Sequence, residues 1–212
     1  MKYATLGRRA VLAGAVLTIT VALSSCGVAD AGGHDPVAPA HGSVSAGSAF
    51  NDVDATFLRM MIPHHQQAVE MAALAGTKAT DPQIKRLAAQ IGTQQNAEIE
   101  TMRSWLAAQG QPTTMPDCPG AGCMPSGMMP SGMPAMPGMM SGADMAKLRA
   151  ATGKDFDRLF LREMIAHHQA AVMMAKVELA HGANQDVKAL AGRIVTTQQA
   201  EIATMRQLLD QL

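Results

Sequence analysis

Two long stretches of the chain repeat apolar residues at every third or fourth position. In the first stretch, the positions on this face are Phe57, Met61, His64, Ala68, Met71 and Ala75. In the second stretch, they are Ile84, Ala88, Ile91, Gln95, Glu98, Met102 and Trp105. Such spacing places side chains on one face of an α-helix. The pattern therefore predicts two amphipathic helices, each about 25 residues long.

The ends of these helices carry recognisable capping residues. Asp52 or Asp54 can cap the start of the first helix, because a short polar side chain can accept a hydrogen bond from the first free backbone N–H groups. Asp81 stands directly before Pro82, which is a favoured order at the start of a second helix. Gly110 follows that helix and predicts its end.

The same pattern occurs a second time, 103 positions later. Residues 57–66 match residues 160–169 without a gap, and residues 95–103 match residues 198–206. About half of the positions from Asp52 to Arg103 are identical to their partners. We interpret this as an internal duplication. In the second copy we expect Asp155 to start a helix, Gly182 to end it and Asn184 to cap the last one.

A single helical hairpin cannot cover its own apolar face, but two hairpins together form an all-α four-helix bundle. We divide the folded part, 51–212, into repeat 1 (51–110), a Met/Pro/Gly-rich connection (111–142) and repeat 2 (143–212). A short extra helix is expected at about 143–151.

The first 50 residues indicate that the protein is exported, and we do not expect them to be part of the folded domain. A basic start with Arg8 and Arg9 precedes an apolar run that is too short for a membrane span, so 1–25 is predicted to be a signal peptide. The segment that ends at Cys26 resembles a lipoprotein cleavage site, which predicts lipidation of Cys26; a plain secretory signal is the alternative. General secretion and twin-arginine export both remain open. Residues 26–50 predict a flexible tether.

Composition excludes several classes of function. The chain has 17 basic and 17 acidic residues, which argues against nucleic acid as a partner. Neither copy contains a nucleophile with a neighbouring base, so no enzyme is predicted. Two inward glutamates are too few for a di-iron carboxylate site.

Each copy carries paired histidines on its first helix and inward polar residues on its second. The histidines are His64, His65, His167 and His168, and the facing residues are Gln95, Glu98, Gln198 and Glu201. A buried carboxylate requires a partner, so we expect the imidazoles to provide one. This predicts two internal polar layers bordered by thioethers, with metal binding as one interpretation. The alternative is that His–Glu contacts fix the helix register and Met fills gaps.

The connection between the copies is rich in methionine. Nine of the 18 methionines lie between 113 and 145, among Pro, Gly and Ser, and we expect them not to fill the core. Thioether sulfur is a soft ligand that suits Cu(I) and, by the same softness, Ag(I). The methionines predicted to capture metal are Met124, Met128, Met129, Met133, Met136, Met139 and Met140. A low-complexity linker is the alternative. Cys118 and Cys123 predict a disulfide or a thiolate copper site.

Two motifs together resemble the domain of unknown function 305 family, which includes CopM-like secreted copper-binding proteins. They are Phe-x-x-x-Met-Ile-x-His-His-x-x-Ala-Val-x-Met from Phe57 and Ile-x-x-x-Gln-x-x-Glu-Ile-x-x-Met from Ile91. The resemblance covers roughly 50–212. It implies a ferritin-like helical bundle, with Cu(I) and Ag(I) bound by His and Met in some members. The metal ligands that it implies here are His64, His65, Met61, Met71, His167, His168, Met164 and Met174.

These observations predict a surface-anchored, non-enzymatic protein that sequesters or hands over copper outside the cytoplasm. Cu(I) is the expected ion, silver is possible, and no organic cofactor is expected. Metal ions and a membrane, reached through the N-terminal lipid, are the expected partners, and nucleic acid is not. Gln95, Glu98, Gln198 and Glu201 are expected to support the ligands from behind. The competing hypothesis is a structural or interaction module that binds no metal.

Overall fold

The computed structural model describes residues 49–114 and 138–212, which all lie in one compact unit, Ala40–Leu212. Several predicted features fall outside the described residues. They are the signal peptide, most of the tether, the lipidation site at Cys26, the cysteines Cys118 and Cys123, and the methionines Met124, Met128, Met129, Met133 and Met136.

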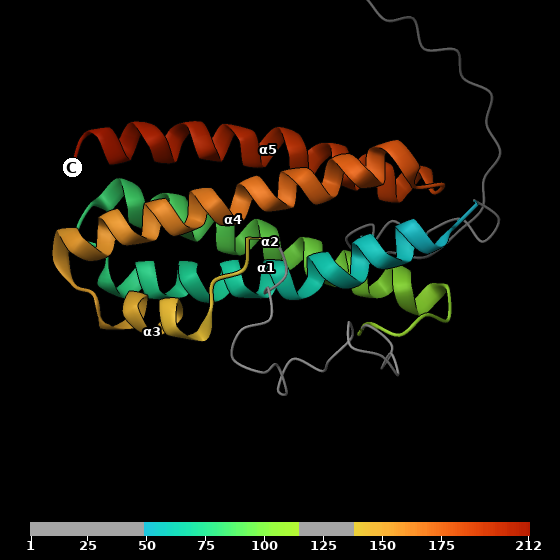
Figure 1. The fold of residues 1–212 in the computed structure, drawn as a ribbon, viewed down its shortest axis with the longest axis horizontal. Helices are drawn as coiled ribbons and strands as arrows, with labels where there is room; N and C mark the ends of the chain where they lie inside the picture. Colours follow the sequence, from blue (N-terminus) through green and yellow to red (C-terminus); the bar gives the residue numbers. More distant parts are fainter. Residues whose placement is uncertain (1–48, 115–137) are drawn as a thin grey trace, which may run out of the picture. The chain divides into compact units, whose positions relative to one another are not determined.

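The described residues form five helices and no strand. The helices are α1 (Asp52–Lys78), α2 (Pro82–Ala108), α3 (Gly142–Ala150), α4 (Gly153–His181) and α5 (Gln185–Asp210), as Figure 1 shows. The predicted all-α fold and the short extra helix are confirmed. Within the described ranges, no helix combines the length and apolarity needed to cross a membrane.

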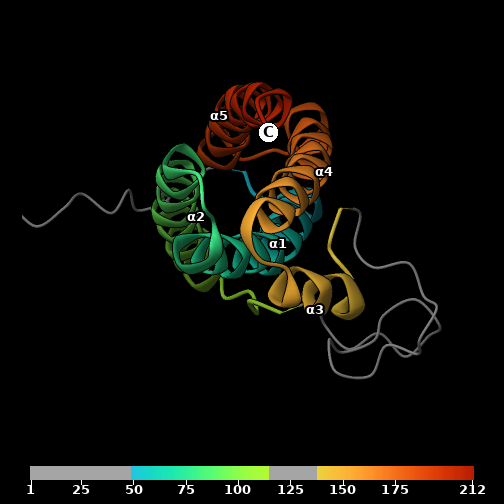
Figure 2. The same ribbon diagram turned by 90° about the vertical axis from the view of Figure 1, so that its left-hand side faces the viewer.

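The four long helices pack as two hairpins, α1 with α2 and α4 with α5. The hairpins meet mainly through α1 and α4, whereas α2 and α5 touch only slightly. Figure 2 looks along the bundle and shows these four helices around a common centre, with α3 on the outside. The predicted four-helix bundle of duplicated hairpins is therefore confirmed.

Four of the predicted helix ends are confirmed. Gly182 is the C-cap of α4. Asp81 caps α2 by accepting a hydrogen bond of 2.6 Å from the backbone N–H of Gln83, with Pro82 in the first turn. Asn184 caps α5 in the same way. Gly110, with a φ of +62°, follows α2 in the left-handed region that glycine favours.

The predicted starts of α1 and α4 are wrong by a few residues. Asn51, not Asp52 or Asp54, caps α1: its side chain accepts from the backbone N–H groups of Val53 and Asp54. The Asp54 carboxylate accepts from the backbone N–H of Asn51 in return. In repeat 2 the cap position is Thr152, and Asp155 lies in the first turn.

Asp54 does not cap α1 because its carboxylate also faces the turn between α4 and α5. It accepts hydrogen bonds from the backbone N–H groups of Ala183, at 3.1 Å, and Asn184, at 3.0 Å. Asp157 occupies the matching position in repeat 2 and faces the turn between α1 and α2. It accepts from the backbone N–H groups of Thr80, at 3.0 Å, and Asp81, at 3.2 Å. Each repeat therefore caps the turn of the other repeat.

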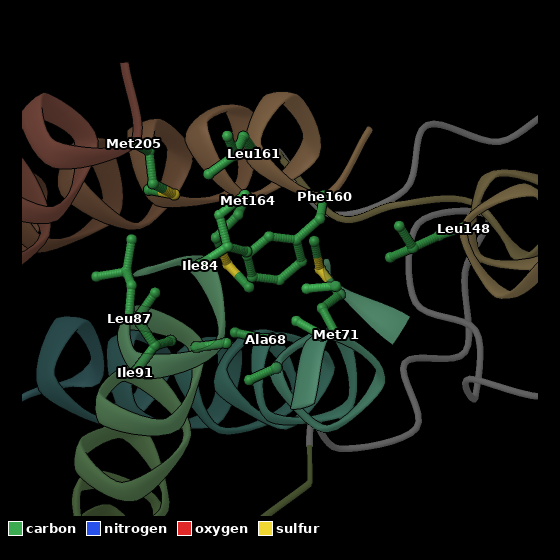
Figure 3. Packing of buried hydrophobic residues seen from close by; sticks show 14 of the residues in the cluster. Ala68, Met71, Ile84, Leu87, Ile91, Leu148, Phe160, Leu161, Met164 and Met205 are labelled. Atoms are coloured by element: carbon green, nitrogen blue, oxygen red, sulfur yellow. The ribbon is translucent and has the colours of Figure 1, made fainter. Parts of the chain in front are cut away.

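The apolar core consists of two separate clusters. One combines the C-terminal half of α1 and the N-terminal half of α2 with the N-terminal half of α4 and the C-terminal half of α5. Figure 3 shows part of it, with Met71 of α1, Phe160 and Met164 of α4, and Met205 of α5 pointing into the core between the helices. The other cluster contains the remaining half of each helix. The break between the clusters lies at the same level in all four helices.

The expectation that the methionines of the connection stay outside the core is wrong for two of them. Met140 is 7% exposed and Met145 is 4% exposed, and both belong to the first cluster together with Leu148. The reason is that the end of the connection turns back onto the bundle, and the next helix, α3, places Met145 and Leu148 against it. Burial of these side chains fixes α3 to the outside of the bundle.

Candidate metal centre

A polar layer fills the gap between the two apolar clusters. Six of its side chains are at most 2% exposed: His64, His65, Gln95, His167, His168 and Gln198. Each lies at the break between the clusters on its helix. The structure therefore brings all four predicted histidines together at the mid-length of the bundle.

Adjacent residues of a helix point about 100° apart, so the two histidines of each pair face different neighbouring helices. His64 points from α1 toward α4, where its ring centroid lies 3.6 Å from that of His167. His65 points toward α2, where its Nε2 lies 2.7 Å from Glu98 Oε2. His168 repeats the second contact with Glu201, at 2.9 Å.

The contact between His64 and His167 corrects the prediction of two separate polar layers. These residues are equivalent in the two repeats, and their rings face each other across the α1–α4 interface. Equivalent residues meet in this way on an approximate twofold axis. The reciprocal contacts of His65 with Glu98 and of His168 with Glu201 lie on either side of that axis. The molecule therefore contains one central layer instead of two.

Glu98 and Glu201 give the buried histidines the carboxylate partners that the sequence predicted. Their side chains are 12% and 13% exposed. Burial alone would raise the pKa of Glu98, but its hydrogen bond and charge interaction with His65 and its hydrogen bond with Gln94 together lower it. Glu98 is therefore a carboxylate at neutral pH, and it fixes the orientation of the His65 ring.

Many polar atoms in the layer have no hydrogen-bond partner. They include both ring nitrogens of His64 and of His167, and the Nδ1 atoms of His65 and His168. Gln95 is unpaired at both side-chain atoms, and Gln198 at its oxygen. Buried polar groups are normally paired, so a cluster of unpaired polar atoms in one layer indicates that a ligand binds there or that these groups have a function.

The central imidazoles are electrically neutral. Burial, and then the charges that His65 and His168 would carry, lower the pKa of His64 to about 3. Burial and the same kind of neighbours, with His64 first among them, hold the pKa of His167 well below its usual value. At neutral pH each ring therefore keeps one nitrogen lone pair free of a proton, which is the form that binds metal ions.

The predicted methionine ligands flank the layer on both sides. Met61, Met71 and Met164 are fully buried, whereas Met174 is half-buried. Met61 and Met174 pack with one apolar cluster, and Met71 and Met164 with the other, as Figure 3 shows for the second pair. Each apolar cluster therefore offers the polar layer two thioethers.

In the described part of the chain, no three His, Cys, Asp or Glu side chains are grouped closely enough to hold one ion. The four imidazoles therefore do not form a closed site of the kind that holds structural zinc. An ion in this layer would need two imidazoles, or would combine imidazole with the flanking thioethers.

A groove of about 650 Å³ lies between α2 and α5, two helices that touch only slightly. It is lined by Gln94, Glu98, Ala189, Gly192, Arg193, Thr196 and Thr197. Glu98 lines this groove and also contacts His65, so it connects the groove with the buried layer. The charge of Arg193 is one of the influences that lower the pKa of Glu98.

From the sequence, no site role was expected for three residues that stand out here. Asp54 and Asp157 hold the turns, which only the three-dimensional pairing of the repeats reveals. Gln67 binds the backbone of Met140 through both of its side-chain atoms. The step of three residues from His64 to Gln67 was the available signal, because it places both on neighbouring positions of one helix face.

Comparisons with known proteins agree with the helical fold. The domain of unknown function DUF305 matches residues 54–209. A DUF305 protein from Streptomyces coelicolor, named as a candidate secreted protein, is 34% identical, with a TM-score of 0.65 over 75% of this chain and 93% of that chain. The Cu(II)-bound form of CopM is 35% identical, with a TM-score of 0.62 over 74% of this chain and 96% of that chain. No curated protein matches the chain.

CopM is also known in Cu(I)-bound and Ag-bound forms, which are 34% and 33% identical to this chain. A DUF305 fragment from Deinococcus radiodurans is 32% identical, with a TM-score of 0.65 over 77% of this chain and 99% of that one. The family match spans both repeats and the connection between them. The chain therefore belongs to the DUF305 family of helical proteins.

Proposed function

We propose that this protein binds a soft metal ion, Cu(I) or Ag(I), in the central histidine layer, and that it sequesters or hands over copper outside the cytoplasm. The observation that carries the proposal is the set of six imidazole nitrogens, from His64, His65, His167 and His168, that are buried without a hydrogen-bond partner. Such atoms are costly to bury unpaired, and a metal ion would satisfy them.

The chemistry of the layer favours a soft cation over a hard one. The central histidines are neutral, and thioethers flank them on both sides. Imidazole and thioether donors suit copper, and a thioether needs no deprotonation to bind. In this proposal His64 and His167 are the central ligands, with His65 and His168 beside them. Met61, Met71, Met164 and Met174 supply sulfur.

Relatives support the choice of ion. CopM has been solved with Cu(I), with Cu(II) and with Ag, and this chain covers 96% of the Cu(I)-bound chain. The family match, residues 54–209, spans the part of the chain in which the layer lies.

Glu98 and Glu201 orient the ligands in this proposal. Each carboxylate holds the Nε2 side of one imidazole, which leaves the Nδ1 side of that ring for an ion. A carboxylate in this position also makes the ring a better donor. Gln95 and Gln198 lie in the same layer and offer further polar atoms.

The remaining parts of the proposal rest on the sequence. Lipidation at Cys26 would anchor the protein to a membrane surface, and the methionines of the connection would capture ions before they reach the layer. Cys118 and Cys123 would form a disulfide or join the capture segment.

Thermal unfolding with and without the ion tests the proposal. Excess Ag(I) is expected to raise the melting temperature of the full chain, because a ligand that binds only the folded state stabilises it. His64→Leu should remove that rise. If the layer only fixes the fold, His64→Leu will keep or increase stability, and the response to Ag(I) will be the same in both proteins.

A further inference from the structure

The end of the methionine-rich connection lies directly over the α1–α4 interface. Gly138 sits against α4: a Cβ atom on this residue would come within 2.2 Å of the Ala170 Cβ and 3.4 Å of the His167 carbonyl oxygen. Its φ is +79°, which is a conformation that favours glycine. Close approach and backbone conformation therefore both require glycine at this point.

Two residues later the chain is attached to α1. The backbone N–H of Met140 donates to Gln67 Oε1 at 2.7 Å, and Gln67 Nε2 donates to the Met140 carbonyl at 3.0 Å. The Met140 side chain is buried in the first apolar cluster. Residues 138–140 therefore form a strap that is held on α4 at one end and on α1 at the other.

The strap crosses the interface at the level of the histidine pair. Gln67 and Ala170 occupy equivalent positions in the two repeats, each three residues after a central histidine. Because the strap touches both, it lies across the approximate twofold axis on which His64 and His167 face each other. It therefore covers the end of this axis on the α1–α4 face of the bundle. The groove between α2 and α5 lies on the opposite face.

We infer that the strap closes an access route to the His64–His167 pair, and that the Gln67 clamp on Met140 sets how fast a soft ion passes through it. Both rings are fully buried, so an ion entering from the α1–α4 side must displace the strap. Met139 lies between the two attachment points and is half-buried. This inference rests on the proposed function and adds to that function a control of the rate at which the ion enters the histidine layer.

The clamp can be removed without touching a candidate ligand. Gln67→Ala deletes both hydrogen bonds to Met140, and Gly138→Ala lifts the other end through its clash with Ala170. Gln66→Ala is the matched control, because Gln66 is the neighbouring glutamine and is exposed. The measurement is the rate at which the full chain, under anaerobic conditions, takes Cu(I) from a coloured chelator.

Both strap variants are expected to take up Cu(I) about fivefold to tenfold faster than the wild type, which corresponds to the loss of one or two ordinary hydrogen bonds. Equilibrium stoichiometry should stay the same, and Gln66→Ala should behave like the wild type. As a measurement without metal, oxidation of Met140 by dilute hydrogen peroxide, followed by peptide mass spectrometry, should accelerate in both strap variants.

If the strap variants bind Cu(I) and take it up at the same rate as the wild type, the strap does not control entry, and the proposed function is left intact. The α2–α5 groove would then be the route to examine. Faster Met140 oxidation with unchanged uptake would overturn the inference as well, because the strap would open without controlling entry. If the wild type binds no Cu(I), the proposed function fails and the inference fails with it.

Discussion

Asp54 and Asp157 occupy the same position in the two repeats, and each carboxylate holds the interhelical turn of the other repeat. Asp157 accepts from the backbone of Thr80 and Asp81, and Asp54 accepts from Ala183 and Asn184. Both aspartates are fully buried. The duplication therefore stabilises the protein through exchanged caps as well as through a shared core, and the two hairpins depend on each other.

Removing one of these caps should destabilise the whole bundle. Asp157→Ala leaves the backbone N–H groups of Thr80 and Asp81, at the α1–α2 turn, without their acceptor, so we expect a loss of about 1–3 kcal/mol in the free energy of unfolding. Chemical denaturation followed by circular dichroism measures this. Asp155→Ala, at an exposed position two residues away, should change stability by no more than about 0.5 kcal/mol. Equal effects of the two substitutions would contradict the exchanged-cap account.

Glu178 predicts a dependence of stability on pH. Its side chain is fully buried and lies beside Asp54 of α1 and near Lys188 of α5. Burial first, and then the neighbouring Asp54 carboxylate, raise the pKa of Glu178 to about 8, against the smaller opposing influence of Lys188. Its equivalent in repeat 1 is Ala75, so repeat 1 lacks this group.

A raised folded-state pKa means that the folded protein binds the proton more tightly than the unfolded chain does. The contribution of Glu178 is therefore most favourable below pH 4.5, and it is lost as the pH rises through about 8. Glu178→Gln should raise the free energy of unfolding at pH 9 by about 1–3 kcal/mol relative to the wild type, with little difference at pH 4. Urea unfolding at several pH values checks this. Glu70→Gln, on the surface, should leave the pH profile unchanged.

The flanking thioethers can be tested with substitutions that conserve volume. Met61→Leu combined with Met164→Leu should cost less than about 1.5 kcal/mol per site in stability. If these sulfurs bind the ion, the affinity for Cu(I) should fall about tenfold or more. Met102→Leu with Met205→Leu is the matched control, because these methionines are also fully buried, one in each cluster. A comparable fall in the control pair would mean that packing, and not sulfur, sets the affinity.

The carboxylates behind the histidines should tune affinity without changing the number of ions. Glu98→Gln combined with Glu201→Gln keeps the size of the side chains but weakens their hold on His65 and His168. We expect an affinity for Cu(I) that is about 10-fold to 100-fold lower at unchanged stoichiometry, measured by competition with a chelator. Glu100→Gln, at an exposed position of the same helix, should have no effect. Unchanged affinity in the double variant would remove these carboxylates from the account.

Local sequence predicted the helices and several of their ends because the information there is local. The order Asp81–Pro82 and the side chain of Asn184 determine caps within a few residues. The start of α1 was predicted wrongly because Asp54 has a second task in the other repeat. The capping preferences of neighbouring residues cannot reveal a contact with a distant part of the chain.

The residues of the buried polar layer were predictable, but their arrangement was not. The periodicity placed His64, His65 and Glu98 inside the bundle, as found. It did not show that His64 would meet His167, because this depends on how the two hairpins align along α1 and α4. The burial of Met140 was missed for a related reason: a Pro/Gly-rich composition does not reveal where a connection lands on the bundle.

The most direct test of the account is an anaerobic titration of the full chain with Cu(I) against a competing chelator, comparing the wild type with a variant that carries both His64→Leu and His167→Leu. The account predicts an affinity tighter than micromolar in the wild type and the loss of a tightly bound ion in the variant, which remains folded. A wild-type affinity no better than micromolar, or an unchanged affinity and stoichiometry in the variant, would contradict it.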